Sequence, residues 1–102
     1  MTQQAVLVYI KLLKGPWGGP DERRALERLE DRLEEVIDES GVGEFDGNEV
    51  GEGFWRLFTY GSNADRLFDV IVPIVRSWTV PPGSYVIKRY GQPGEEEHRF
   101  DL

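Results

Sequence analysis

Four carboxylates lie within nine residues of the chain, between Glu44 and Glu52. Carboxylate-rich stretches bind hard cations such as Ca²⁺, so the candidate metal ligands are Glu44, Asp46, Glu49 and Glu52. Their spacing lacks the regular Asp positions and the closing Glu of an EF-hand loop. A polar turn that prevents a sheet edge from pairing with another chain uses the same residue types. We therefore interpret the stretch as a polar hairpin and predict no metal site there.

Catalytic chemistry has few candidate groups in this sequence. The only imidazole is that of His98, in a Glu-rich tail, and there is no cysteine to act as a nucleophile or a metal ligand. A nucleophile needs a base beside it, and a His in a charged tail is typical of an exposed side chain. The glycines at positions 41, 43 and 47 lack the spacing of a dinucleotide-binding loop. We assign no catalytic residue and no cofactor, and the residues favour a non-enzymatic role without settling it.

Length and charge limit the classes of protein that the chain can belong to. It has 102 residues, 39% of them hydrophobic, which is enough for one compact domain over 1–102. The longest apolar stretch, residues 5–10, is far shorter than the roughly 20 residues that span a bilayer, and no basic leader precedes it. The net charge of −7 repels phosphate backbones and anionic lipid. We expect a soluble, cytoplasmic protein that does not bind membranes, and the charge disfavours nucleic acid as a partner.

Hydrophobic periodicity predicts the elements that must position these groups. Alternating apolar residues indicate strands, and apolar residues at every third or fourth position indicate amphipathic helices. The predicted strands are 5–13, 42–46, 54–60 and 84–90, and the predicted helices are 21–39 and one that begins at Ser62 or Asn63. Residues 47–53 should form a long or bulged turn. Because Pro73 removes a helical hydrogen bond, we expect a kink or a break at 69–73.

The order strand, helix, strand, strand, helix, strand resembles the ferredoxin-like fold over about residues 5–90. The resemblance implies an α+β βαββαβ sandwich, with a four-stranded antiparallel sheet and two helices on one face. Residues 92–102 follow as a turn and an acidic tail, which either stays loose or adds a short fifth strand. Dozens of unrelated activities share this fold, so it does not identify a function.

The alternation of side chains assigns the two faces of the predicted sheet. The helices should cover the apolar face, which bears Val6, Val8, Ile10, Leu12, Trp55 and Leu57. The opposite face, the expected interaction face, combines aromatic rings with cations: Tyr9, Lys11, Phe54, Arg56, Phe58, Tyr60, Lys88 and Tyr90. Lys88 and Tyr90 belong to this face if Tyr85 and Ile87 point inward.

Two segments loosely resemble the strand motifs of an RNA-recognition domain. They are residues 8–13 and 53–57, and the resemblance implies that Tyr9 and Phe54 stack on bases. The sequence departs from the motif at Glu52, where a basic residue is usual, and at Arg56, which replaces a ring. Together with the charge of −7, these departures make RNA binding the last of the alternatives.

The function we predict is that of a non-catalytic interaction module. Monomers rarely expose large apolar patches, so the expected interaction face should be covered by a second copy, a protein partner or the chain's own tail from Gln92 onward. Self-association as a homodimer is our first expectation. The alternatives are a regulatory domain with a small ligand at a subunit interface, then a small ferredoxin-like enzyme. Trp17 either pins its Gly-rich loop to the core, which we expect, or serves as an exposed contact.

Overall fold

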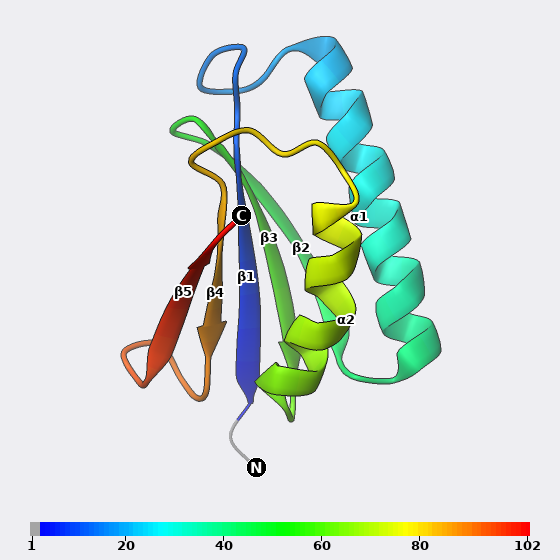
Figure 1. Ribbon diagram of the computed structural model, residues 1–102, viewed down its shortest axis with the longest axis vertical. Coiled ribbons are helices and arrows are strands. Elements are labelled where there is room, and N and C mark those ends of the chain that lie inside the picture. Colours follow the sequence, from blue (N-terminus) through cyan, green and yellow to red (C-terminus); the bar gives the residue numbers. More distant parts are fainter. Residues whose placement is uncertain (1–2) are drawn as a thin grey trace.

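In the computed structural model, which describes residues 3–102, the chain folds into a five-stranded antiparallel sheet and two helices (Figure 1). The strands are β1 (Gln4–Lys11), β2 (Glu44–Gly51), β3 (Phe54–Gly61), β4 (Tyr85–Arg89) and β5 (Glu97–Asp101), and the helices are α1 (Pro20–Ser40) and α2 (Ala64–Arg76). The pattern is βαββαββ and the strand order is β2-β3-β1-β4-β5. The acidic tail therefore adds a fifth strand at the edge of the sheet.

Helix α1 follows the predicted amphipathic pattern closely. Pro20 occupies its first turn, where a missing N–H is harmless, and the carboxylate of Glu22 accepts a hydrogen bond from the backbone N–H of Gly19. Gly41 ends the helix with a left-handed φ of 66°. The buried side chains repeat at three- and four-residue steps: Leu26, Leu29, Leu33 and Ile37. No helix in the described part of the chain has the length and apolar character needed to cross a membrane.

Helix α2 begins at the second of the two predicted caps and passes through Pro73. The side chain of Asn63 accepts a hydrogen bond from the backbone N–H of Arg66, and the helix continues to Arg76. Of the kink or break expected at 69–73, the break is therefore wrong. Proline costs a helix interior about 3 kcal/mol, but each fully buried aliphatic side chain contributes about 1.5–3 kcal/mol. Val75 is fully buried one half-turn beyond Pro73, so packing on the sheet favours continuation of the helix.

The β2–β3 hairpin is tighter than the sequence indicates. Its turn consists of Glu52 and Gly53, both with positive φ, as the mirrored hairpin turns require. Strand β2 includes most of the stretch that was expected to be a long turn, because β3 supplies hydrogen-bonding partners along its whole length. The expected long or bulged turn over 47–53 is therefore wrong, and a bulge lies instead within β2, between Phe45 and Gly47.

Both helices cover the same face of the sheet (Figure 1). The six sheet residues predicted for this face are all buried. Thr59 is buried among them, and its hydroxyl donates a 2.6 Å hydrogen bond to the backbone carbonyl of Val6. The indole N–H of the buried Trp55 donates to the carboxylate of Glu30 on α1. The core therefore lies between the sheet and the two helices, and the other side of the sheet has no helix over it.

Candidate functional site

The side of the sheet turned away from the helices, here named the open sheet face, carries an aromatic cluster. Directly opposite residues of antiparallel strands share a face, so the strand register defines its members. They are Ala5, Leu7, Tyr9, Lys11, Phe54, Arg56, Phe58, Tyr60, Tyr85, Ile87 and Arg89. Ala5 and Leu7 are buried although no helix covers them, and the larger side chains around them are half-buried. Large side chains of this face therefore cover the small ones.

Three rings in the open sheet face contact one another. Tyr9 and Tyr85 are opposite residues on β1 and β4, and their rings stack with centroids 4.6 Å apart and an angle of 9° between the planes. The ring of Phe54 meets both of them edge-on, at 6.2 Å from Tyr9 and 5.8 Å from Tyr85. Edge-on and near-parallel arrangements are the favourable geometries for aromatic pairs. The three rings form one cluster across β3, β1 and β4.

Lys88 and Tyr90 lie on the helix side, which corrects the expected interaction face. Lys88 is opposite the buried Val6, and its ammonium donates a 2.8 Å hydrogen bond to Asp65 of α2. The phenol of Tyr90 donates to the same carboxylate. The pattern of 84–90 allowed either orientation of the strand, and the pairing of Val86 with the buried Val8 decides it. Tyr85 and Ile87 occupy the open sheet face instead.

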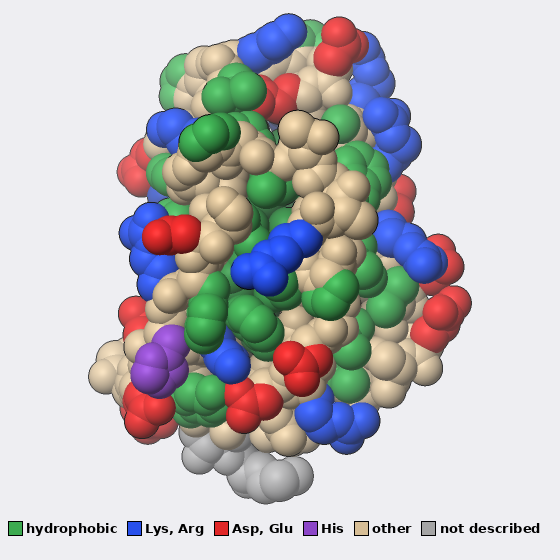
Figure 2. Space-filling model, viewed as in Figure 1, with side chains coloured by type: hydrophobic (Ala, Val, Ile, Leu, Met, Phe, Trp, Pro, Cys, Tyr) green, Lys and Arg blue, Asp and Glu red, His purple; other side chains and the backbone are tan. Residues whose placement is uncertain are grey.

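The stem of Lys88 crosses an apolar junction between α2 and β5. Its ammonium lies 4.5 Å from the ring centroid of Phe68 and 5.2 Å from that of Phe100. Figure 2 shows hydrophobic side chains gathered between α2 and the C-terminal strand, with charged side chains around them. The hydrogen bond from Lys88, and then that from Tyr90, lowers the pKa of Asp65. The hydrogen bonds of Lys88 and Tyr90 to Asp65 therefore join α2 to the sheet and are structural contacts.

Two cations, Arg56 of the open sheet face and Arg99, which lies opposite Ile87 on β5, are paired with carboxylates or rings of the chain itself. Arg56 donates to Glu49 at 3.2 Å and to Glu52 at 3.0 Å, and the hydrogen bond to Glu52 raises the pKa of Arg56. Arg99 of β5 stacks on the Tyr85 ring at 3.8 Å and donates to Asp101 at 3.0 Å. Such internal pairing leaves both guanidinium groups less available to an external phosphate.

The four candidate metal ligands do not converge on one point. Glu49 and Glu52 hold a guanidinium, Glu44 lies opposite Tyr60, and Asp46 lies in the bulge of β2. Within residues 3–102, no three His, Cys, Asp or Glu side chains come close enough to hold a metal ion together. In this structure the acidic hairpin neutralises Arg56 and places negative charge along one edge of the sheet.

Charge and apolar area are arranged in bands across the open sheet face. One row of opposite residues places Phe58, Leu7 and Ile87 side by side at its centre. The acidic side chains come from the two edge strands, β2 and β5. Because β5 pairs with β4 in the plane of the sheet, the tail widens the sheet and does not fold over the open sheet face. An apolar centre with charged margins is the usual anatomy of a protein interface.

Burial raises the pKa of the Tyr9 phenol. Desolvation is the largest cause that raises its pKa above the ordinary value for tyrosine, the neighbouring Tyr85 adds to it, and Arg56 opposes it. The phenol of Tyr9 is therefore neutral at physiological pH. This arrangement can pack against another flat apolar or aromatic surface.

Trp17 is exposed, which contradicts the expected packing against the core. Its side chain is 64% exposed, and any side chain at Gly51 would meet the indole at 3.5 Å. The Gly-rich loop is held by its backbone, because the N–H of Gly53 donates to the carbonyl of Pro16 at 3.2 Å. Trp17 thus flanks the tip of the β2–β3 hairpin, beside the strand pair that carries Phe54.

Tyr85, Ile87 and Arg89 are the residues of β4 on the open sheet face that sequence reasoning missed. The signal available was the alternation of 85–90, which is compatible with either face.

Comparison of the chain with protein-family models, with curated proteins and with solved structures found no match.

Proposed function

We propose that the chain is a non-catalytic interaction module that self-associates by packing the open sheet face of one copy against the same face of a second. The observation that carries the proposal is the cluster of Tyr9, Phe54 and Tyr85 on a sheet face that no helix covers. Large apolar patches on soluble proteins commonly mark interaction sites. A two-fold dimer is the commonest way for a chain to cover one of its own surfaces.

The fold supports this use of the sheet. The first six elements, β1 to β4 with the two helices on one face, favour a ferredoxin-like assignment, to which β5 adds a strand. Five strands at a spacing of about 4.8 Å give a sheet about 24 Å wide, with a projected area on the order of 500 Å². Because the surface of a sheet is corrugated, its accessible area is larger than this projection and approaches the area that each partner contributes to a stable interface, about 800 Å².

Charge favours a protein surface over a nucleic acid as the occupant. Arg56 and Arg99 already pair with carboxylates of the chain, and the net charge is −7. A phosphate backbone would have to displace those carboxylates and overcome the overall repulsion. An aromatic centre with charge-balanced margins is matched by another surface of the same kind.

The test is the mass of the protein in solution. We expect wild type to be a dimer at tens of micromolar by sedimentation or light scattering, with Kd on the order of 1 μM. Phe58→Glu places a charge at the centre of the open sheet face and should give a folded monomer. Leu13→Glu makes the same change at a side chain that is 70% exposed outside this face, and should stay dimeric.

A second variant keeps the proposal testable if Phe58→Glu does not fold. Ile87→Lys changes a half-buried side chain on β4 and should also give a folded monomer. A monomeric wild type at tens of micromolar would refute self-association. A dimer that persists in folded Ile87→Lys would place the interface elsewhere.

A further inference from the structure

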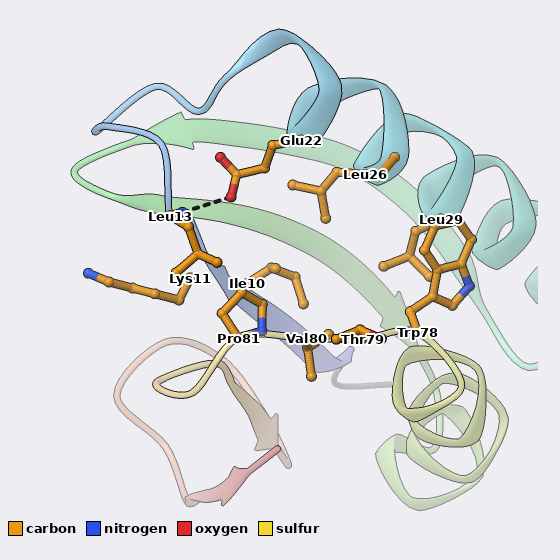
Figure 3. A pocket seen from close by; sticks show the side chains of 11 residues that line it. Ile10, Lys11, Leu13, Glu22, Leu26, Leu29, Trp78, Thr79, Val80 and Pro81 are labelled. Carbon is orange, nitrogen blue, oxygen red and sulfur yellow. Dashed lines mark hydrogen bonds between the residues drawn. The ribbon is translucent and has the colours of Figure 1, made fainter.

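A cavity of about 170 Å³ lies on the helix side of the molecule, between the start of α1 and the segment that joins α2 to β4 (Figure 3). Its origin is the unequal length of the helices. α1 has 21 residues and α2 has 13, so α1 extends about 12 Å further at a rise of 1.5 Å per residue. Beyond Arg76 the chain is irregular and contains Pro81 and Pro82, which cannot continue a helix. The first turns of α1 consequently have no helix beside them.

The walls of this cavity are almost entirely apolar. They come from three elements, β1, α1 and the segment 78–81, and include Ile10, Leu26, Leu29, Trp78, Val80 and Pro81. Ile10 and Leu29 are 2% and 1% exposed, so they form a floor that belongs to the core. Ala25 also lines the cavity, and its small side chain leaves the space open on the α1 side. Figure 3 shows Trp78 at one end of the cavity and Leu13 at the other.

A fixed carboxylate forms the polar rim. Glu22 accepts hydrogen bonds from the backbone N–H groups of Leu13 at 2.7 Å, Lys14 at 3.3 Å and Gly19 at 3.3 Å. These bonds hold the negative charge beside the opening, and the two carboxylate oxygens have acceptor capacity for one more donor. Lys11 contributes its stem only, because its ammonium lies 4.9 Å from the ring centroid of Phe54 on the open sheet face.

We propose that this cavity binds a small neutral aromatic molecule with one hydrogen-bond donor directed at Glu22. An apolar protein cavity of about 150 Å³ is large enough to bind benzene, so a volume of about 170 Å³ suits one substituted ring. The indole of Trp78 supplies an aromatic wall, and the carboxylate at the rim selects donors and rejects anions. The proposal does not depend on self-association, because the cavity and the open sheet face lie on opposite sides of the sheet.

Titration with phenol, followed by ¹⁵N NMR of the intact chain, tests the proposal. Phenol should cause saturable shifts confined to the amides around 22–29 and 78–80, with Kd on the order of 1 mM or tighter. Benzoate has the same ring with a carboxylate and should bind at least about tenfold more weakly. The phenol ring protons should show NOEs to the methyl groups of Leu29. Absence of saturable shifts up to about 10 mM phenol, or equal affinity for benzoate, would overturn the proposal.

Filling the cavity supplies the matched variant. Ala25→Leu adds three carbon atoms to the space and should abolish the phenol shifts without lowering the melting temperature. Arg28→Leu makes a comparable apolar substitution at an exposed position of α1 and should bind phenol as wild type does. Unchanged phenol affinity in folded Ala25→Leu would show that phenol binds elsewhere. If Ala25→Leu does not fold, the NOEs to Leu29 in wild type decide the question.

Discussion

The stacked rings of Tyr9 and Tyr85 allow the geometry of the open sheet face to be measured by a double-mutant cycle. Their centroids lie 4.6 Å apart at an interplanar angle of 9°, and such pairs contribute about 0.5–1.5 kcal/mol beyond the burial of their area. Tyr9→Leu and Tyr85→Leu each remove the stack and keep an apolar side chain. Contacts that each ring makes with Phe54 cancel in the cycle when they are independent of the stack. We expect a coupling energy of about 1 kcal/mol.

Urea unfolding of wild type, the two single variants and the double variant gives this energy. With an m value of about 1.5 kcal/mol/M, a coupling of about 1 kcal/mol places the midpoint of the double variant about 0.7 M above the additive expectation. The control cycle pairs Tyr85→Leu with Tyr60→Leu, because Tyr60 lies opposite Ala5 and away from the stack. That cycle should be additive within about 0.5 kcal/mol. Equal additivity in both cycles would refute the stacked geometry.

Association would complicate these midpoints, and protein concentration separates the two effects. Unfolding of a dimer to monomers shifts to higher urea as the protein concentration rises, whereas unfolding of a monomer does not. Each cycle is therefore measured at two concentrations that differ by about tenfold. Coupling that is the same at both concentrations belongs to the stack within one chain. Coupling that appears only at the higher concentration would assign the rings to the interface.

Three further predictions concern the helix side of the sheet. Burial raises the pKa of Glu30, and the hydrogen bond from Trp55 opposes this shift. The free energy of unfolding should therefore fall as pH rises through that pKa. Glu30→Gln should remove this pH-dependent loss, measured by urea unfolding at pH 4 and at pH 7. Hydrogen bonds lower the pKa of Asp65, so the free energy of unfolding should fall as pH falls through that pKa. Asp65→Asn should therefore destabilise the protein at pH 7 but not at low pH. Gly43→Ala would place a carbon 2.2 Å from the carbonyl oxygen of Tyr60 and should cost at least about 2 kcal/mol, visible as a lower melting temperature.

Local sequence patterns were sufficient to predict both helices and four of the strands. The three- and four-residue spacing of Leu26, Leu29, Leu33 and Ile37 requires only that one helix face be buried, and the structure buries that face. Alternation along residues 5–13 likewise identified the buried face of β1. These predictions succeed because the period of a helix or a strand is a property of the backbone, and burial acts on each element separately.

Properties that depend on a partner strand were decided by the tertiary structure alone. Whether Tyr85 or Val86 points outward depends on the strand register with Val8 and Tyr9, which are more than seventy residues earlier in the chain. The acidic tail became β5 because β4 offered a free edge, and β2 includes a polar stretch because β3 pairs with it. Backbone hydrogen bonds between strands are indifferent to side-chain polarity, so a polar sequence does not by itself exclude a strand.

The continuation of α2 through Pro73 and the ion pairs of Arg56 both depend on contacts that the pattern of each single element does not contain. A local rule assigned the proline a cost, and only the packing of α2 on the sheet supplied the compensating burial. Arg56 is seven residues from Glu49, and the turn of the hairpin brings the two charges within 3.2 Å. The sequence determined which residue types the molecule contains and which faces of its elements are apolar. The aromatic stack of Tyr9 on Tyr85 arises from a contact between distant strands, and the ion pair of Arg56 with Glu49 arises from the hairpin turn; local periodicity encodes neither.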